Sequence, residues 1–528
     1  MKTKTVLACM ALATLSVQTA VAGGILTNTN QSIDFLRNPA REAAIGLDGV
    51  YSNPAGVAFL PEGLHIGFNW QYAHQTRTIT STDESFKYGR KNNGATTKTY
   101  EGVADAPCIP SVQAAWNKGD WSLQFNFSVP GGGGKCEYSD GLGTFERVVG
   151  GIANKFQAID LFATKLNGAS QLYTMMGRPT PAPLPTHGVS GYDMDSYMQG
   201  RQYYFGLQLG AAYKATENFS VYGGLRLLWG QATYKAKINN IMVNTANGLV
   251  GFESFLPNVP VQAASVAARA QEVLGIINTA QQSGITLPQQ VLDQKTEITN
   301  GLASLQAGQS ELAALQKYSE GVNLLCNQSG LGIAPVLGVD YRLGRWNMAV
   351  KYEFKTQMRM KNESTVFEAS EIEAVNKYRD GESVNEDQPA LLTVGVQYSP
   401  IDAVRINAGW HYYFDKDANW YGNAQEQLDH NTNEFLLGAE WDINNRLTVS
   451  AGGQLTRYGL TDQYMNDMSF VVNSYSLGFG ANYKLSDVVT VKAAYFQTNY
   501  TNYKRTQPTT DTFTRSNRVL GIACELTL

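Results

Sequence analysis

The stretch from Arg41 to Leu60, REAAIGLDGVYSNPAGVAFL, contains the tetrapeptide Asn53-Pro54-Ala55-Gly56. Asparagine caps helices and proline fits the first helical position, so a short apolar helix is predicted from Ala55 to Leu60. The chain beyond Gly63 reads as β-strands. A short apolar segment before a barrel has the lumen as its expected place, so residues 23–63 are predicted to form a plug, gated by the tetrapeptide. An arm on the periplasmic rim is the alternative.

From Gly63 onward, alternating apolar and polar segments are joined in pairs by short turns. Each turn opens with Trp or Tyr and contains Gly, Asn, Asp or Pro; the six turns are 116–121, 213–219, 341–346, 398–404, 441–447 and 483–489. Six hairpins and one unpaired strand at each end, 64–74 and 516–528, make fourteen strands. The predicted fold class is all-β: a transmembrane antiparallel barrel over residues 64–528, with an N-terminal plug and helical extracellular loops.

The alternation also predicts which side chains face the lumen. In residues 346–355 one face carries Asn347, Ala349, Lys351, Glu353 and Lys355. Lipid hydrocarbon accepts charges only at high cost, so this charged face is assigned to the lumen. The six turns are short and the connections on the other side are mostly long, which places both chain ends on the periplasmic side. A polar lumen fits an aqueous pore as well as a plugged transporter.

Composition agrees with a barrel in the outer membrane of a Gram-negative bacterium. The 528 residues include 28 Tyr and 51 Gly, and only 16% are charged. Beyond the first two dozen residues there is no apolar run of about 18, so helical membrane spans are not expected. The net charge of -4 argues against a nucleic-acid partner.

The first residues have the pattern of a secretory signal. Lys2 and Lys4 precede an apolar core, and Ala20-Val21-Ala22 forms a small-residue cleavage site. Residues 1–22 are therefore predicted to be a signal peptide. Cleavage as a lipoprotein at Cys9 is the alternative.

The Gly/Ala-rich segment ending in Asn53-Pro54-Ala55-Gly56, directly before the first of fourteen strands, resembles the FadL-type outer-membrane transporters. The resemblance covers nearly the whole mature chain. It implies passive uptake of long-chain fatty acids or other hydrophobic compounds, a kinked strand that opens the wall sideways, and extracellular helices around a hydrophobic entry groove. The expected partners are hydrophobic small molecules and outer-membrane lipid. We expect a monomer, and neither a cofactor nor a metal.

The third strand, Trp121 to Val129, runs into Pro130-Gly131-Gly132-Gly133-Gly134. Proline cannot donate a ladder hydrogen bond and glycines have no side chains to hold register, so the strand is predicted to kink or end early. Under the resemblance, this break is the lateral opening. A flexible start to the following loop is the alternative.

The long loop over residues 131–201 carries one apolar helical stripe, with spacings of three and four: Phe145, Val148, Ile152, Phe156 and Ile159. Such a stripe needs a partner, which is another loop, an apolar ligand or the barrel rim. The resemblance implies that these residues contribute to hydrophobic ligand entry.

A second insertion, at about 250–330, shows apolar residues repeating every seven positions: Val259, Val266, Val273 and Ala280, then Val291, Ile298, Leu305 and Leu312. This spacing predicts a helical hairpin of coiled-coil character. It either covers the pore or serves as a binding arm for a surface partner.

Cysteines and catalytic patterns add little. Cys108 and Cys136 flank one predicted hairpin on its loop side, so a disulfide between them is possible, and free thiols or another pairing stay open. The five histidines lack paired ligand spacing, and no nucleophile elbow or phosphate loop is found, so no enzyme is predicted. Passive hydrophobic uptake is the leading hypothesis. A surface adhesin or structural barrel acting through the helical hairpin, or a general diffusion porin, remains as an alternative.

Overall fold

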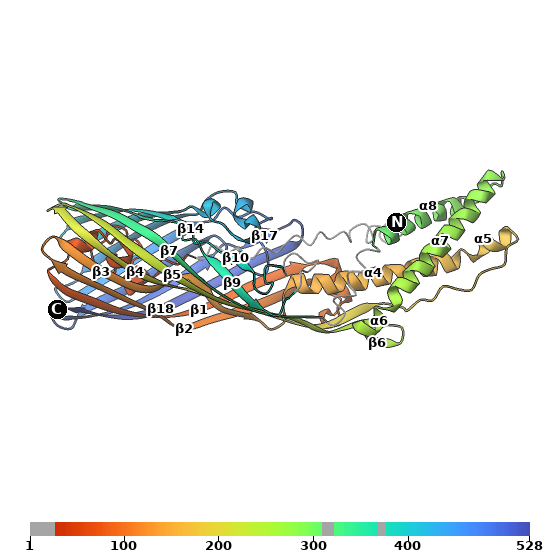
Figure 1. Cartoon of the computed structure of the whole chain (residues 1–528), viewed down its shortest axis with the longest axis horizontal. Helices are drawn as coiled ribbons and strands as arrows, with labels where there is room; N and C mark the ends of the chain where they lie inside the picture. Colours follow the sequence, from red (N-terminus) through yellow and green to blue (C-terminus); the bar gives the residue numbers. More distant parts are fainter. Residues whose placement is uncertain (1–26, 309–320, 368–375) are drawn as a thin grey trace.

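The computed structural model describes residues 27–308, 321–367 and 376–528. The predicted signal peptide (1–22) and the first residues of the predicted plug (23–26) lie outside the described residues. Figure 1 shows a barrel with long helices that extend from one of its ends. We call this the outer end, and the opposite end, where the chain terminates, the inner end.

The predicted antiparallel barrel of fourteen strands is confirmed. It closes because the first strand pairs with the last along its whole length, from His65 opposite Thr527 to Thr82 opposite Thr510. The strands, in order around the wall, are β1 (Gly63–Thr82), β2 (Thr97–Lys118), β3 (Trp121–Tyr138), β4 (Gly191–Thr216), β5 (Phe219–Thr245), β7 (Val322–Leu343), β8 (Trp346–Glu353), β11 (Leu391–Ile401), β12 (Val404–Tyr413), β13 (Asn433–Asp442), β14 (Leu447–Arg457), β15 (Ser474–Lys484), β16 (Val489–Tyr500) and β18 (Thr510–Thr527).

Four short strands, β6 (Gly248–Gly251), β9 (Arg359–Ser364), β10 (Ser383–Asn385) and β17 (Tyr503–Arg505), extend the sheet at the outer end. All six predicted short turns join neighbouring strands at the inner end. Aromatic rings from adjacent strands meet there: Trp121 and Tyr213 have centroids 4.8 Å apart, and Trp346 and Tyr398 have centroids 4.3 Å apart. Such a belt of Trp and Tyr is typical of the membrane interface.

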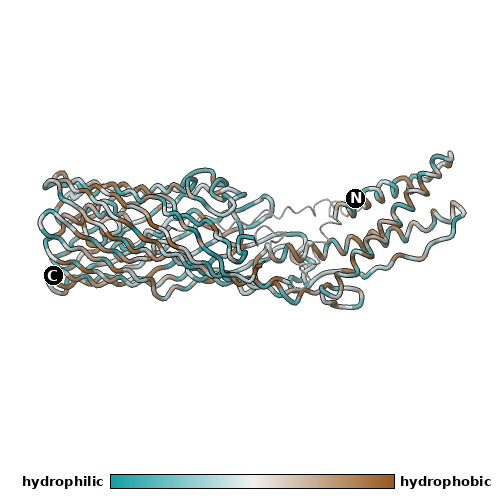
Figure 2. Tube along the Cα trace, in the orientation of Figure 1, coloured by the Kyte–Doolittle hydropathy of each residue, from teal (hydrophilic) through white to brown (hydrophobic). Residues whose placement is uncertain are grey.

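Buried and exposed side chains alternate along the strands that cross the membrane. Hydrophobic and hydrophilic residues accordingly alternate along the trace of the barrel (Figure 2). On β8, Asn347, Lys351 and Glu353 are buried in the lumen, whereas Met348 and Val350 are exposed on the outer face. The charges therefore lie inside the wall, and an apolar surface faces outward to the bilayer.

The strands beside the large loops run further than predicted. β3 continues to Tyr138 instead of ending near Val129, and the second insertion is shortened because β5 runs to Thr245 and β7 begins at Val322. Beyond the membrane a strand no longer faces lipid on one side, so its alternation weakens although its ladder continues.

The loops carry the helices α4 (Gly143–Gly168), α5 (Ser170–Met175), α6 (Phe252–Phe255), α7 (Asn258–Gln282) and α8 (Gln289–Ala307). α7 and α8 belong to the second insertion, and the residues predicted from the seven-residue repeat are buried where described, including Val266, Val273 and Ile298. Leu312 lies outside the described residues. Among the helices that the structure describes, none is both long and apolar enough to cross a bilayer.

Candidate functional site

Residues 27–62, which we call the N-terminal segment, lie among the inward-facing polar side chains of the barrel. The wall donates hydrogen bonds to backbone carbonyls of this segment from many strands: Gln124 on β3 to Pro54 at 2.7 Å, Ser220 on β5 to Ala55 at 2.7 Å, Asn347 on β8 to Ala43 at 2.7 Å, and Asn407 on β12 to Ala40 at 3.1 Å. The segment therefore crosses the lumen near its inner end.

The tetrapeptide predicted as the gating element lies against this wall. The Asn53 side chain accepts a hydrogen bond from the Gly56 amide (3.2 Å) and donates one to Asp340 Oδ2 on β7 (2.6 Å). A Cβ on Gly56 would lie 2.3 Å from the Asn53 side-chain amide nitrogen, so a larger residue there would displace the Asn53 side chain. The helix that follows is a 3₁₀ turn, η1 (Gly56–Phe59), instead of the expected Ala55–Leu60 helix, because the carbonyls of Pro54 and Ala55 bind the wall.

The remaining helical elements of the segment are α2 (Ile33–Arg37) and α3 (Gly49–Ser52). Asn38-Pro39-Ala40 repeats the Asn-Pro-Ala pattern and is followed by residues of high helix propensity, yet residues 41–44 form only a turn. Tertiary contacts outweigh helix propensity here, because Arg41 binds Glu440 and Glu42 binds His411. Both partners belong to the barrel wall.

A buried ion network fastens the segment to the wall. Arg41 binds Asp48 at 2.8 Å and Glu440 of β13 at 2.7 Å, and Arg37 binds Asp34 at 2.7 Å and the same Glu440 at 2.9 Å. Burial alone lowers the pKa of Arg41, but the carboxylates of Asp48 and Glu440 outweigh it and raise the pKa well above its usual value. The N-terminal segment is thus held by buried ion pairs. Removing any one of these charged side chains would leave its partner buried without a counter-charge.

β3 does not end at the predicted break, but its pairing is irregular there. From Phe127 to Glu137 it uses ten steps where β4, from Leu207 to Gln199, uses eight, so two extra residues bulge between Ser128 and Gly134. Gly132 has a φ of +104°, and a Cβ at this position would lie 2.4 Å from the Gln202 carbonyl oxygen. Pro130 and the glycines at 131–134 therefore bend the strand without terminating it.

On the other edge of this bend, β3 separates from β2. The two strands pair at Val112 with Phe127 and at Val103 with Glu137, and the described residues between these points form no ladder pairs. Pro107 and Pro110 of β2 lie in this interval and have no amide hydrogen to donate. These two prolines are a sequence signal for the gap that the residues of β3 alone do not carry.

The N-terminal segment contacts the bent part of β3 directly. Thr27 forms a β-bridge with Gly131, the Asn28 amide donates to the Pro130 carbonyl at 2.8 Å, and the Gln31 side chain bonds both the amide and the carbonyl of Val129. A cavity of about 20 Å³, enough for one water, lies beside Pro130 and Thr27. Movement of the N-terminal segment would therefore displace the bent part of β3, which borders the gap.

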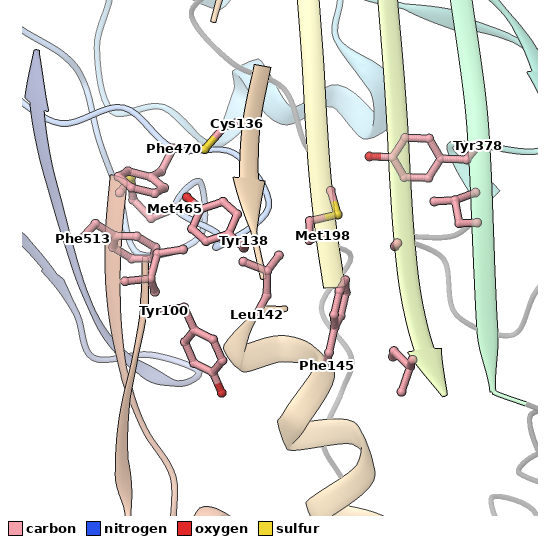
Figure 3. Packing of buried hydrophobic residues seen from close by; sticks show 14 of the residues in the cluster. Tyr100, Cys136, Tyr138, Leu142, Phe145, Met198, Tyr378, Met465, Phe470 and Phe513 are labelled. Carbon is pink, nitrogen blue, oxygen red and sulfur yellow. The ribbon is translucent and has the colours of Figure 1, made fainter. Parts of the chain in front are cut away.

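Towards the outer end, buried apolar side chains pack into a group that we call the aromatic cluster (Figure 3). It combines inward side chains of the strands with the start of α4 and with loops at 414–428 and 458–472. Its members include Ile79, Tyr100, Cys136, Tyr138, Leu142, Phe145, Met198, Tyr378, Trp420, Met465, Phe470 and Phe513. Tyr100 and Cys136 lie on β2 and β3, so the cluster borders the gap between these strands.

The apolar stripe predicted for ligand entry lies on α4 and is largely covered. Phe145 belongs to the aromatic cluster, and Ile152, Phe156 and Ile159 are buried together with residues of α6 and α7; Val148 is partly buried beside them. Phe156 contacts the rings of Phe252 and Phe255 on α6 at centroid distances of 6.0 and 5.2 Å. The partner of the stripe is therefore another loop, and the stripe does not form an open groove.

Truncating Phe156 is expected to loosen these helices and spare the barrel. Phe156→Ala removes a fully buried ring from between α4 and α6, a change that costs about 3–5 kcal/mol. We expect α7 and α8 to become sensitive to limited proteolysis while the barrel fragment stays intact. Leu161→Ala on the exposed face of α4 is the control. If Phe156→Ala resists the protease as well as the wild type does, Phe156 does not hold these helices together.

The cysteine pair that the sequence allowed is not formed. Cys108 is an exposed free thiol and Cys136 is a buried one in the aromatic cluster. Both lie in the interval where the β2–β3 ladder is interrupted, so the strands do not bring them opposite each other. The alternative of free thiols describes the structure.

No family model matches the sequence, and no curated protein matches it either. Several solved structures do match this chain. A Pseudomonas aeruginosa FadL homologue matches with a TM-score of 0.55 and 11% identity, covering 96% of this chain and 99% of that one. A deletion mutant of the monoaromatic hydrocarbon channel TodX matches with a TM-score of 0.53 and 12% identity over 96% and 100% of the two chains. The P. putida toluene transporter TodX matches with a TM-score of 0.50 and 12% identity, covering 92% of this chain and 94% of that one. The chain therefore has the fold of the FadL-type outer-membrane transporters.

Proposed function

We propose that this protein takes up hydrophobic compounds passively across the outer membrane of a Gram-negative bacterium, with long-chain fatty acids as the principal cargo. The observation that carries the proposal is the interruption of the β2–β3 ladder between Val103 and Val112. A gap that adjoins an apolar interior on one side and lipid on the other offers an exit for molecules that prefer hydrocarbon to water.

The surroundings of the gap support lateral release. Inside, Cys136 and Tyr138 of β3 belong to the aromatic cluster. On the outward-facing side, Phe127, Phe205 and Trp229 form a chain of ring contacts with centroids 6.4 and 5.6 Å apart. An alkyl chain passing from the cluster to the bilayer would stay in contact with apolar surface. Each methylene kept out of water contributes about 0.8 kcal/mol, which favours long chains.

In this proposal the N-terminal segment is a plug that includes residues 27–62, preceded by a signal peptide at 1–22. We infer that its ion network holds it across the inner end, where it would exclude small polar solutes; the ion pairs of Arg41 support this over a general diffusion porin. The contact of Thr27, Asn28 and Gln31 with the bent part of β3 supports coupling between plug movement and the gap. In this proposal the protein acts as a monomer, which the closure of the barrel within one chain supports.

The test is equilibrium binding of a fluorescent long-chain fatty acid to the purified full-length protein in detergent. Unlabelled fatty acid, toluene and a sugar serve as competitors. We expect saturable binding that the fatty acid displaces and the sugar does not, because apolar burial drives it. The toluene result measures how broad the site is. Absence of saturable binding by folded protein would refute the proposal and direct attention to α7 and α8 as a surface binding arm.

A further inference from the structure

The outer face of β18 changes from apolar to polar at Arg518. From the inner end outward, the residues on this face are Leu528, Leu526, Cys524, Ile522, Leu520, Arg518, Ser516, Thr514 and Thr512. The apolar part, residues 520–528, has about the 9–11 residues that a tilted strand needs to cross the hydrocarbon of a bilayer. Arg518 therefore lies where the hydrocarbon ends and the lipid head groups of the outer leaflet begin.

A groove on the outer face of the barrel lies directly below this boundary. It has a volume of about 790 Å³ and crosses β14, β15, β16, β18 and β1. Two small residues of its lining, Ala481 and Ala493, are directly opposite each other in the ladder. Tyr495 and Leu520, which are also opposite each other, border them on the side towards Arg518. The groove is thus placed to hold an acyl chain of a lipid whose head group lies at Arg518.

Three cations on the same outer face have no carboxylate partner. Arg518 on β18, Arg457 on β14 and Lys504 on β17 are all exposed. Among the residues that the structure describes, none of the three forms an ion pair. His74, directly opposite Arg518 on β1, is instead bound to Asp105 at 2.7 Å. Unpaired positive charge therefore gathers at and beyond the level of the head groups, above the groove.

We propose that this face binds one molecule of lipid A, the phosphorylated glycolipid of the outer leaflet. Its phosphates contact Arg518, Arg457 and Lys504, and one of its acyl chains occupies the groove. Guanidinium forks match the geometry of a phosphate. Apolar contact by itself gives little preference inside a bilayer, because the surrounding lipid is equally apolar. The cations therefore supply the selectivity, and the groove fixes where the lipid lies.

Two other occupants fit this face less well. A phospholipid of the inner leaflet has its head group at the opposite end of the barrel from Arg518. A second copy of the chain, docked by two-fold symmetry, would place the three cations of one copy against those of the other, because such an interface uses the same patch twice. Like charges at that distance repel, so the observations favour an anionic lipid.

The test is native mass spectrometry of the purified full-length protein in detergent. The protein is titrated with bisphosphorylated lipid A, and separately with the same lipid after both phosphates have been removed. We expect one phosphorylated lipid A to bind each chain saturably, and the dephosphorylated lipid to bind at least about tenfold more weakly. Arg518→Met should weaken binding of the phosphorylated lipid about fivefold, the effect of one basic residue beside an anionic head group. Arg359→Met is the matched control, because Arg359 is an exposed arginine on β9, away from the groove.

Ala493→Phe tests the groove, because the added ring would fill it. This variant should bind both lipids more weakly than the wild type does. Ala439→Phe is its control, since Ala439 is equally exposed on the outer face of β13 and does not line the groove. Neither alanine is buried, so the barrel should stay folded in both variants.

Several results would overturn the lipid A site. They are equal affinity of the wild type for the two lipids, the same loss in Arg359→Met as in Arg518→Met, and no lipid A on the folded wild type. Equally strong binding of phosphatidylglycerol would assign the face to a phospholipid instead. A mass of two chains that Ala493→Phe reduces to one would assign the groove to a second copy. Fatty-acid binding is measured separately, so each of these results would leave the proposed uptake function intact.

Discussion

Replacing Arg41 with alanine is expected to open the inner end of the lumen to ions. Arg41 binds Asp48 within the N-terminal segment and Glu440 on the wall, and all three side chains are buried. Removing one partner of such a buried network costs about 3–5 kcal/mol, because the remaining carboxylates stay desolvated without their counter-charge. The segment should therefore leave the lumen for part of the time. Conductance in planar lipid bilayers measures this directly.

Arg405→Ala is the matched control for this experiment. Arg405 binds the same Glu440 at 3.1 Å, and also Asp442, and both of these partners belong to β13 of the barrel wall. Its loss should leave the segment seated and the conductance at the wild-type level. The Arg41→Ala barrel should resist unfolding as the wild type does. If such folded protein shows only wild-type conductance, the ion network does not hold the segment in the lumen.

Deleting Gly132 and Gly133 is expected to abolish uptake without abolishing binding. β3 has two more residues than β4 between Phe127 and Glu137, so removing two should restore regular pairing with β4 and keep the following side chains on their original faces. The bend that carries β3 away from β2 would then be lost, and the gap should narrow. Fatty-acid uptake by cells should fall to that of cells lacking the protein, while purified protein still binds the fluorescent ligand.

The control is a deletion of equal size, Thr180 and Pro181, in the irregular part of the loop between α5 and β4. This deletion leaves every strand pair unchanged and should transport normally. Uptake by the glycine-deletion variant at the wild-type rate would separate transport from the β2–β3 gap and require another exit. Loss of ligand binding by the same variant would instead mean that the bend shapes the binding site.

The barrel was predictable because its physics is local. Alternation has a period of two, and lipid excludes charge, so Lys351 and Glu353 could be assigned to the lumen from the sequence alone. Turn residues and interfacial aromatics are also local signals, and they located all six short turns. The seven-residue spacing of Val259, Val266 and Val273 likewise identified α7, because one helix face repeats at that interval.

The N-terminal segment was harder to predict because its conformation depends on distant residues. Helix propensity favoured a helical turn after Ala40, yet Arg41 binds Glu440 and Glu42 binds His411, partners 399 and 369 positions away. The covering of the α4 stripe by α6 had the same cause, since periodicity shows that a face is apolar but not what it meets. Pro107 and Pro110 were readable signals for the gap, but only once the strand opposite the glycines was known.

By itself, then, the sequence determined the strands, the turns, the face of each side chain and the presence of a segment that is not part of the wall. Tertiary structure alone decided which groups meet across the lumen, because barrel closure joins the first strand to the last in one register. That register places Arg77 opposite Arg515, 438 positions apart, and the same closure brings Glu440 to Arg41. A pattern of period two specifies which way a side chain points; the closed ladder specifies its neighbour.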